Sequence, residues 1–94
     1  MSTTLERKWY AAVASIGECM LCGATSHLQV SHSNMLRGLG SRSAPWNTAR
    51  LCEKCHTEID NGKLLTQEQR RALHLLAIVK THDRLIRERA MVLA

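Results

Sequence analysis

All four cysteines of the chain fall into two C-x-x-C pairs, Cys19 with Cys22 and Cys52 with Cys55, with 29 residues between the pairs. A spacing of two residues lets both thiolates of a pair reach the same ion, and two such pairs complete the tetrahedral shell of Zn²⁺. The chain begins without an apolar signal segment, so we expect a cytoplasmic protein. In that reducing setting, paired cysteines are typical of metal sites rather than of disulfides, and we predict one structural zinc ion.

The segment from Cys19 to Asp60 also contains four residues that could act in catalysis or bind a metal. These residues are His32, Asn47, His56 and Asp60. His56 and Asp60 are four residues apart, so on a helix both side chains project from one face. A histidine and a carboxylate on one face can hold a divalent cation. A second histidine nearby, free of the cation, could take a proton from water. Together these groups suit hydrolysis of a phosphodiester bond.

The same residues have simpler interpretations that the sequence leaves open. His56 follows Cys55 directly and could be a substitute ligand of the zinc ion, or could contact one of its ligands. Asp60 could be an ordinary surface charge, and His32 a packed or surface histidine. Asn47 could be a plain turn residue, since asparagine is common in turns.

The strands and helix that must position these side chains follow from local patterns. Residues 28–30 alternate between apolar and polar side chains, which predicts a short strand that brings Ser31 and His32 to its end. Residues 48–51 are expected to pair with it as the second strand of a hairpin. The chain then becomes helical over residues 52–61, and Gly62 ends that helix.

Two longer helices are expected on either side of this hairpin and helix. An apolar face recurs at helical intervals over residues 3–16, and Gly17 ends that helix. Thr66 and Gln69 have the spacing of a capping box, which predicts the start of a long helix over residues 66–92.

The long C-terminal helix carries apolar residues on a face that we expect to be buried, and many arginines and lysines elsewhere. We expect His74 and His82 to be structural rather than catalytic. The helix could lie along a nucleic-acid backbone, pair with a second copy to form a homodimer, or present a plain solvated basic face. The residues of the expected buried face are Ala72, Leu75, Leu76, Val79, Ile86 and Ala90.

The segment over residues 33–48 is rich in glycine, serine and asparagine and is expected to be a long loop. Loops of this length without secondary structure are uncommon in a small domain and are usually functional. Arg37, Arg42 and Arg50 lie in it or just after it, and arginine binds phosphate oxygens through its planar fork. We expect these three residues to contact DNA, with an ordinary solvated loop as the alternative.

Composition limits the fold and the partners. The 94 residues suffice for one domain, and with 3% aromatic residues and no phenylalanine the core is thin, so that a structural metal would be a useful supplement. No run of about 18 apolar residues is present, so we expect no membrane span. The formal net charge of +5 falls to about +3 with four thiolates and one zinc ion, which still favours an anionic partner such as DNA.

Taken together, these residues resemble the HNH, or ββα-metal, endonuclease superfamily. The resemblance rests on a histidine at a strand end (His32), an asparagine before the second strand (Asn47), and C-x-x-C-H (Cys52 to His56) leading into a helix. It covers about residues 17–62. The pattern is more narrowly similar to the small YbcO-like and Rap-like nucleases of phages and prophages.

The resemblance implies a role for each matching residue. His32 matches the general base, and Asn47 matches the asparagine that orients the base. His56 matches a ligand of one Mg²⁺ or another divalent cation, and Asp60 falls where some members have a further ligand. Ser31 stands where many members have a stronger ligand. The implied activity is cleavage of DNA, acting on branched or single-stranded DNA in phage recombination.

The fold that we expect is therefore α+β, a single HNH-like domain over residues 1–94. A zinc ion staples its hairpin-plus-helix core over residues 17–62, and helices over 3–16 and 66–92 flank that core. The alternative is a non-catalytic module, stabilised by zinc, that binds DNA or another protein. The weak ligand at Ser31 favours this alternative.

Overall fold

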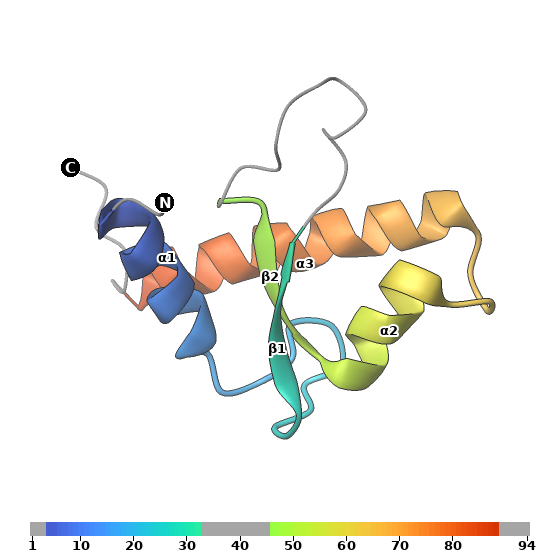
Figure 1. Cartoon of the computed structure of the whole chain (residues 1–94), viewed down its shortest axis with the longest axis horizontal. Coiled ribbons are helices and arrows are strands. Elements are labelled where there is room, and N and C mark those ends of the chain that lie inside the picture. The colour runs from blue at the N-terminus through green and yellow to red at the C-terminus, as the bar shows by residue number, and fades with distance from the viewer. Residues whose placement is uncertain (1–3, 33–45, 89–94) are drawn as a thin grey trace.

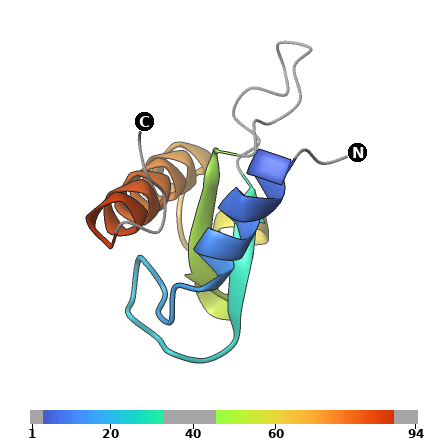
Figure 2. The same cartoon turned by 90° about the vertical axis from the view of Figure 1, so that its left-hand side faces the viewer.

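The computed structural model describes residues 4–32 and 46–88. A two-stranded hairpin stands at the centre, and α1 and α2 lie on opposite sides of it (Figures 1 and 2). The long helix α3 runs beside the hairpin next to β2 (Figure 2). In chain order the elements are α1 (Thr4–Ala14), β1 (Leu28–His32), β2 (Thr48–Cys52), α2 (Glu53–Asn61) and α3 (Gln67–Arg87).

The hairpin confirms the two strands and the pairing expected from the sequence. β1 and β2 are antiparallel, with Leu28 opposite Cys52 and His32 opposite Thr48. His32 is the last residue of β1, at the strand end where the sequence predicts it. The register therefore brings the end of β1 next to the start of β2, where Asn47 lies.

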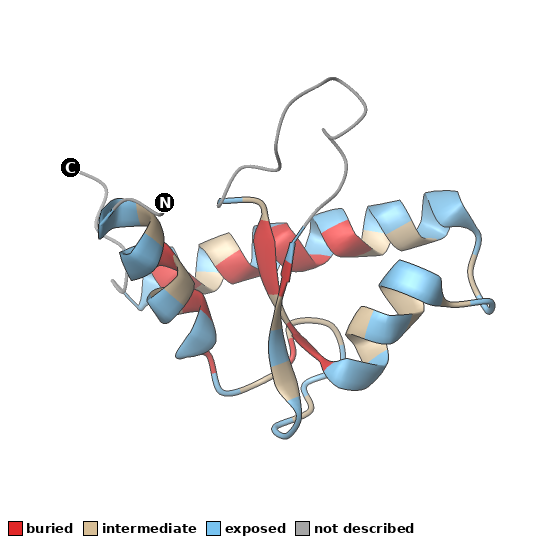
Figure 3. Cartoon of the chain, viewed as in Figure 1, coloured by how far each residue is buried: buried red, intermediate tan, exposed pale blue. Residues whose placement is uncertain are grey.

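Two hydrophobic clusters form the core, one toward α3 and one toward α1 (Figure 3). Because side chains alternate across a strand, each strand contributes to both sides of the hairpin. The first cluster contains the buried residues Cys19, Ala49, Leu51, Cys52, Ala77 and Ile78. The second contains Trp9, Val13, Ile16 and Leu85, with Val30 packed against it.

Helix α1 is fixed to the hairpin by a polar contact inside the second cluster. The indole Nε1 of Trp9 donates a hydrogen bond of 2.7 Å to the hydroxyl oxygen of Thr48, and both residues are buried. The expected apolar face is largely confirmed, since Trp9, Val13 and Ile16 are buried, whereas Leu5 is exposed. The helix ends at Ala14 rather than at residue 16.

We expect Thr48→Val to destabilise the domain by about 1–3 kcal/mol, because the buried indole N–H would lose the acceptor that Thr48 provides. Urea denaturation would measure the loss. Thr57→Val, an exposed position on α2, is a matched control and should change the free energy of unfolding by less than about 0.5 kcal/mol. Equal stabilities of the two variants would contradict the assigned role of this contact.

Helix α3 begins with the capping box that the sequence predicts. The Thr66 hydroxyl accepts from the Gln69 amide at 3.1 Å, and the Gln69 side chain accepts from the Thr66 amide at 2.9 Å. The helix continues to Arg87, and residues 89–92 of the expected helix, with Ala90 of its expected buried face, lie outside the described residues.

The expected buried face of α3 is wrong. Leu75, Leu76, Val79 and Ile86 are exposed, and Ala72 is exposed as well. The side that packs on the hairpin consists of His74, Ala77, Ile78, Thr81 and Leu85. His74 and Thr81 are polar, so hydrophobicity alone predicted that the opposite side of the helix is buried. Hydrogen-bond partners in the hairpin make their burial possible: His74 contacts Ser31 at 2.9 Å, and the Thr81 hydroxyl accepts from the Arg50 amide at 3.2 Å.

Among the described residues, none of the helices is long and apolar enough to cross a lipid bilayer.

Candidate functional site

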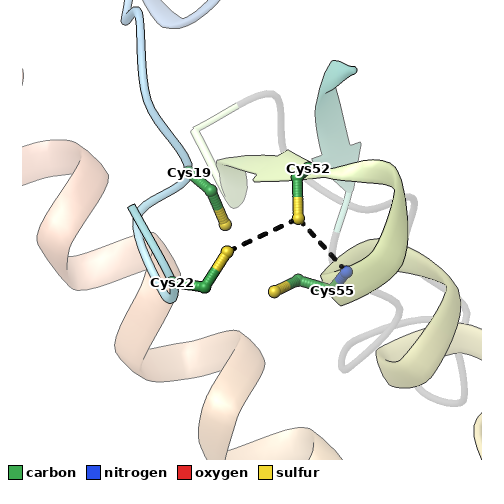
Figure 4. Close-up of side chains that lie close together, drawn as sticks. All are labelled: Cys19, Cys22, Cys52 and Cys55. Carbon is green, nitrogen blue, oxygen red and sulfur yellow. Dashed lines mark hydrogen bonds between the residues drawn. The ribbon is translucent and has the colours of Figure 1, made fainter. Parts of the chain in front are cut away.

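The four cysteines lie together at the base of the hairpin (Figure 4). Cys19 and Cys22 come from the turn before β1, Cys52 ends β2, and Cys55 lies in the first turn of α2. All four sulfur atoms are within 4.8 Å of one another, and the Sγ atoms of Cys22 and Cys52 are 3.6 Å apart. Metal–sulfur bonds of about 2.3 Å give a tetrahedron with edges of about 3.8 Å. The cluster is therefore compatible with a metal ion such as zinc.

Local backbone contacts shape the two ends of this cluster. The Gly23 amide donates to the Cys19 carbonyl at 3.0 Å, and Gly23 has a φ of +78°, a conformation that glycine adopts without strain. The sulfur of Cys52 caps α2 by accepting from the Cys55 amide at 3.5 Å. The Met20 amide donates to the Arg50 carbonyl at 2.9 Å, which joins the turn to β2.

The electrostatics of the cluster favour a cation. Burial raises the pKa of the Cys19 thiol, but hydrogen bonds from the backbone amides of Cys22, Cys52 and Leu21 outweigh burial and lower that pKa to about 6. Burial, followed by hydrogen bonds with the other sulfurs, raises the pKa of Cys55. Cys19 thus ionises easily because backbone amides stabilise its thiolate, whereas Cys55 resists ionisation chiefly because it is buried. A bound divalent cation would stabilise all four thiolates.

His56 and Asp60 lie next to each other on α2, as their spacing predicts. The Nε2 atom of His56 is 3.0 Å from a carboxylate oxygen of Asp60, and Nδ1 is 2.6 Å from the amide oxygen of Gln29 on β1. When the ring hydrogen is on Nδ1 and is donated to that amide oxygen, the Nε2 lone pair of a neutral ring faces the carboxylate. In that tautomer, a metal ion between Nε2 and the carboxylate would have one nitrogen and one oxygen ligand.

Gln29 is a residue of the site that sequence reasoning missed. A metal-binding histidine usually donates its other ring N–H to an oxygen that fixes the ring, and Gln29 occupies that position toward His56. The sequence shows only a polar residue in an alternating strand. That alternation places Gln29 on one side of β1, but it does not indicate that α2 packs against this side.

His32 lies at the end of β1 and is exposed. The centre of its ring is 5.5 Å from that of Tyr10 on α1, with the planes inclined by 55°. Strand alternation places Gln29 and Ser31 on one side of β1 and His32 on the other. His32 therefore contacts Tyr10 on α1, whereas His56 contacts Gln29 on the other side of β1 and Asp60 on α2.

A third histidine, His74 on α3, is close enough to these groups for their charges to affect its pKa. It is buried, and its Nε2 atom contacts the hydroxyl of Ser31, which is fully buried. Burial lowers the pKa of His74, Asp60 raises it, and His56 and His32 lower it. His32, His56 and Asp60 are thus all within electrostatic reach of His74, whose buried, hydrogen-bonded position fits the structural role expected for it.

The remaining predicted site residues are placed as follows. Asn47 is half-buried in the bend just before β2. Arg50 lies within β2, where its Nε donates to the Ile16 carbonyl at 3.0 Å and burial lowers its pKa. Contact of Arg50 with DNA stays a prediction. Arg37 and Arg42 lie outside the described residues.

Comparison with known proteins gives no match, neither to a protein-family model nor to a curated protein or a solved structure. The resemblance to the HNH superfamily therefore rests on the residues and spacings of this chain.

The described residues offer two kinds of metal-binding groups. In residues 4–32 and 46–88, a group of three or more metal-binding side chains with donor atoms within 4.8 Å is found only at the four cysteines. His56 and Asp60 form a smaller pair with one nitrogen and one oxygen donor at 3.0 Å. A divalent cation on this pair would need further oxygen ligands from water or from a phosphate.

Proposed function

We propose that the chain is a divalent-metal-dependent DNA endonuclease of the HNH type, stapled by a structural zinc ion at its four cysteines. The observation that carries the proposal is the pair of His56 and Asp60, 3.0 Å apart on the helix that starts at the cysteine cluster. The contact of Gln29 with Nδ1 supports the proposal, because it leaves Nε2 of His56 available to a cation.

The residues of the site divide between binding the cation and activating water. His56 and Asp60 hold Mg²⁺ or another divalent cation. When bound, that ion polarises the phosphodiester and neutralises charge on the leaving oxygen. His32 takes the proton of the attacking water, for which its exposed ring at the end of β1 is accessible. Asn47 orients His32 from the neighbouring start of β2.

Residues around the site hold these groups in place. The hydrogen bond between Ser31 and His74 fixes the end of β1 against α3, and Ser31 is thereby engaged in the core instead of serving as a ligand. The zinc ion joins the turn before β1 to the start of α2, and so fixes His56 relative to the hairpin. With two protein ligands, the catalytic cation would bind weakly and would draw on phosphate oxygens of the substrate.

DNA is the substrate that fits the chain best. The net charge of +5 favours a polyanion, and Arg37, Arg42 and Arg50 are the proposed phosphate contacts. Action on branched or single-stranded DNA in phage recombination follows from the resemblance alone.

Cleavage by wild type and His32→Ala tests the proposal. Supercoiled plasmid and branched or single-stranded oligonucleotides are incubated with Mg²⁺ or Mn²⁺, and with chelator as a blank. We expect His32→Ala to slow cleavage by about 10²–10⁴-fold, the usual contribution of a general base, without changing the melting temperature.

His27→Asn is the matched control for that experiment. His27 is an exposed histidine just before β1, and its φ of +54° is one that asparagine tolerates. This variant should cleave at the rate of the wild type. Equal cleavage by wild type and His32→Ala would refute the assigned role of His32.

A second candidate function is that of a non-catalytic, zinc-stabilised module that binds DNA or another protein. The contact of His32 with Tyr10 on α1, away from His56 on α2, favours this candidate. A DNA-binding module would bind DNA without added Mg²⁺, with an affinity that falls steeply with salt, and would never cut it. A protein-interaction module would show no such salt-dependent affinity.

A further inference from the structure

The solvent side of α3 carries an apolar stripe, which Asp83 interrupts before Ile86. Leu75, Leu76, Val79 and Ile86 are exposed by 49%, 44%, 56% and 48%, and small Ala72 is exposed as well. Four of the seven large hydrophobic residues that are exposed in the described part of the chain thus lie on one helix. Figure 3 shows how exposed and buried positions alternate along this helix. Apolar patches of this kind mark interaction surfaces more often than isolated residues do.

The stripe is separate from the side of α3 that packs on the hairpin. At about 100° per residue, Ala72, Leu75, Leu76 and Ile86 all fall within about 60° of Val79 around the helix axis. The core residues His74, Ala77, Ile78, Thr81 and Leu85 are centred about 150° away. The helix therefore has one side that packs on the hairpin and a second, more apolar side that faces solvent.

The charges on this side do not favour a polyanion as its partner. Two acidic residues lie on it, Asp83 and, one turn before Ala72, Glu68, and the carboxylate of Asp83 is 2.9 Å from Nε of Arg87. Arg71 and Lys80 lie at the margins, about 80–100° from Val79. An anionic backbone would meet leucine, valine and isoleucine here, whereas an apolar protein surface would be complementary.

The order of the residues along the stripe suits a second copy of the same helix. Ala72 precedes Val79 by seven residues, and Ile86 follows it by seven. Two antiparallel copies related by a two-fold axis at Val79 would place the small Ala72 of each opposite the larger Ile86 of the other. Such contacts are isologous, which means that the same surface of both copies forms the interface and is complementary to itself.

We propose that α3 pairs with α3 of a second copy, antiparallel and centred on Val79. A helix of 21 residues offers a face about 32 Å long and about 10 Å wide. Two such faces fall in the class of small interfaces below about 1,200 Å² in total. The dimer is therefore reversible and depends on concentration. It goes beyond the nuclease proposal and does not depend on it, because neither the cysteines nor His56 lie on α3.

Sedimentation velocity over a range of micromolar concentrations tests the dimer. We expect the wild type to shift from the monomer mass of 10.6 kDa toward twice that mass as concentration rises. Val79→Glu would place two carboxylates next to each other on the axis and should weaken association by about 100-fold or more. Because Val79 is 56% exposed, its far-UV circular dichroism and metal content should equal those of the wild type.

Leu64→Glu provides the matched control, since Leu64 is 89% exposed and precedes α3. It adds the same charge off the stripe and should leave association unchanged. Val79→Cys gives an independent readout, because a residue on the two-fold axis lies next to the same residue of the second copy. A short bis-maleimide should therefore cross-link the two introduced cysteines. Leu64→Cys lies off the stripe and should not cross-link. A wild type that stays monomeric at all concentrations, or a Val79→Glu variant that still dimerises, overturns the proposal.

Discussion

Replacing Cys52 by alanine is expected to unfold the domain at ordinary temperature. Cys52 offers one of four sulfur ligands, and its sulfur also caps α2 by accepting from the Cys55 amide. Zinc binding by small four-ligand domains is worth about 10–16 kcal/mol, whereas the total stability of a small domain is about 5–15 kcal/mol. The core cannot compensate, since it contains a single buried aromatic residue among those described, Trp9.

Cys52→Ser separates the two tasks of this residue. Serine is a good helix cap but does not replace a thiolate on zinc, so this variant should regain only about 1 kcal/mol relative to alanine. Circular dichroism with elemental analysis for zinc would check both variants. A strong chelator should unfold the wild type in the same way, and added Zn²⁺ should restore it. A Cys52→Ala protein that melts with the wild type would show that the metal contributes little to folding.

The second large effect is expected for His56→Ala, which should abolish metal-dependent cleavage of DNA. Removing this imidazole leaves Asp60 as the remaining proposed protein ligand of the catalytic cation, and we expect a loss of about 10³-fold or more in cleavage rate. The ring is partly exposed on the surface of α2, so the cost in stability should be small. Zinc content should stay that of the wild type.

Gln29→Ala should have a smaller effect on metal-dependent cleavage than His56→Ala. It removes the group that holds Nδ1 but leaves both proposed ligands in place. Such outer partners typically change metal affinity by about 10–100-fold. We therefore expect the half-saturating Mg²⁺ concentration to rise while cleavage at saturating Mg²⁺ largely recovers. If His56→Ala cleaves like the wild type, the cation is not held on α2, even if another part of the chain cuts DNA.

Local signals in the sequence predicted most of the fold. The capping box at Thr66 and Gln69, the alternation in β1 and the helical spacing of α1 each depend on residues within a few positions of one another. The two C-x-x-C pairs were predictable for the same reason, because each pair is local, and a metal ion that both pairs could share predicts that they come together. The spacing of His56 and Asp60 likewise fixed their contact within one helical turn.

Contacts between distant segments could not be predicted in this way. The buried side of α3 is decided by Ser31 and Arg50, which give His74 and Thr81 hydrogen-bond partners far away in the sequence. Without those partners, a polar side would not be buried, and hydrophobicity alone favours the opposite side. The contact of Gln29 with His56 and that of Tyr10 with His32 also depend on how the helices pack on the hairpin.

The four sulfurs come from two places in the chain, Cys19 and Cys22 before the hairpin and Cys52 and Cys55 at its far end. With a metal bound, they close the chain between Cys22 and Cys52 into a ring. A break in the backbone within that ring would leave two pieces still tethered through the ion. With the metal bound, the two strands would thus be held together by an anchor that does not depend on the segment between them.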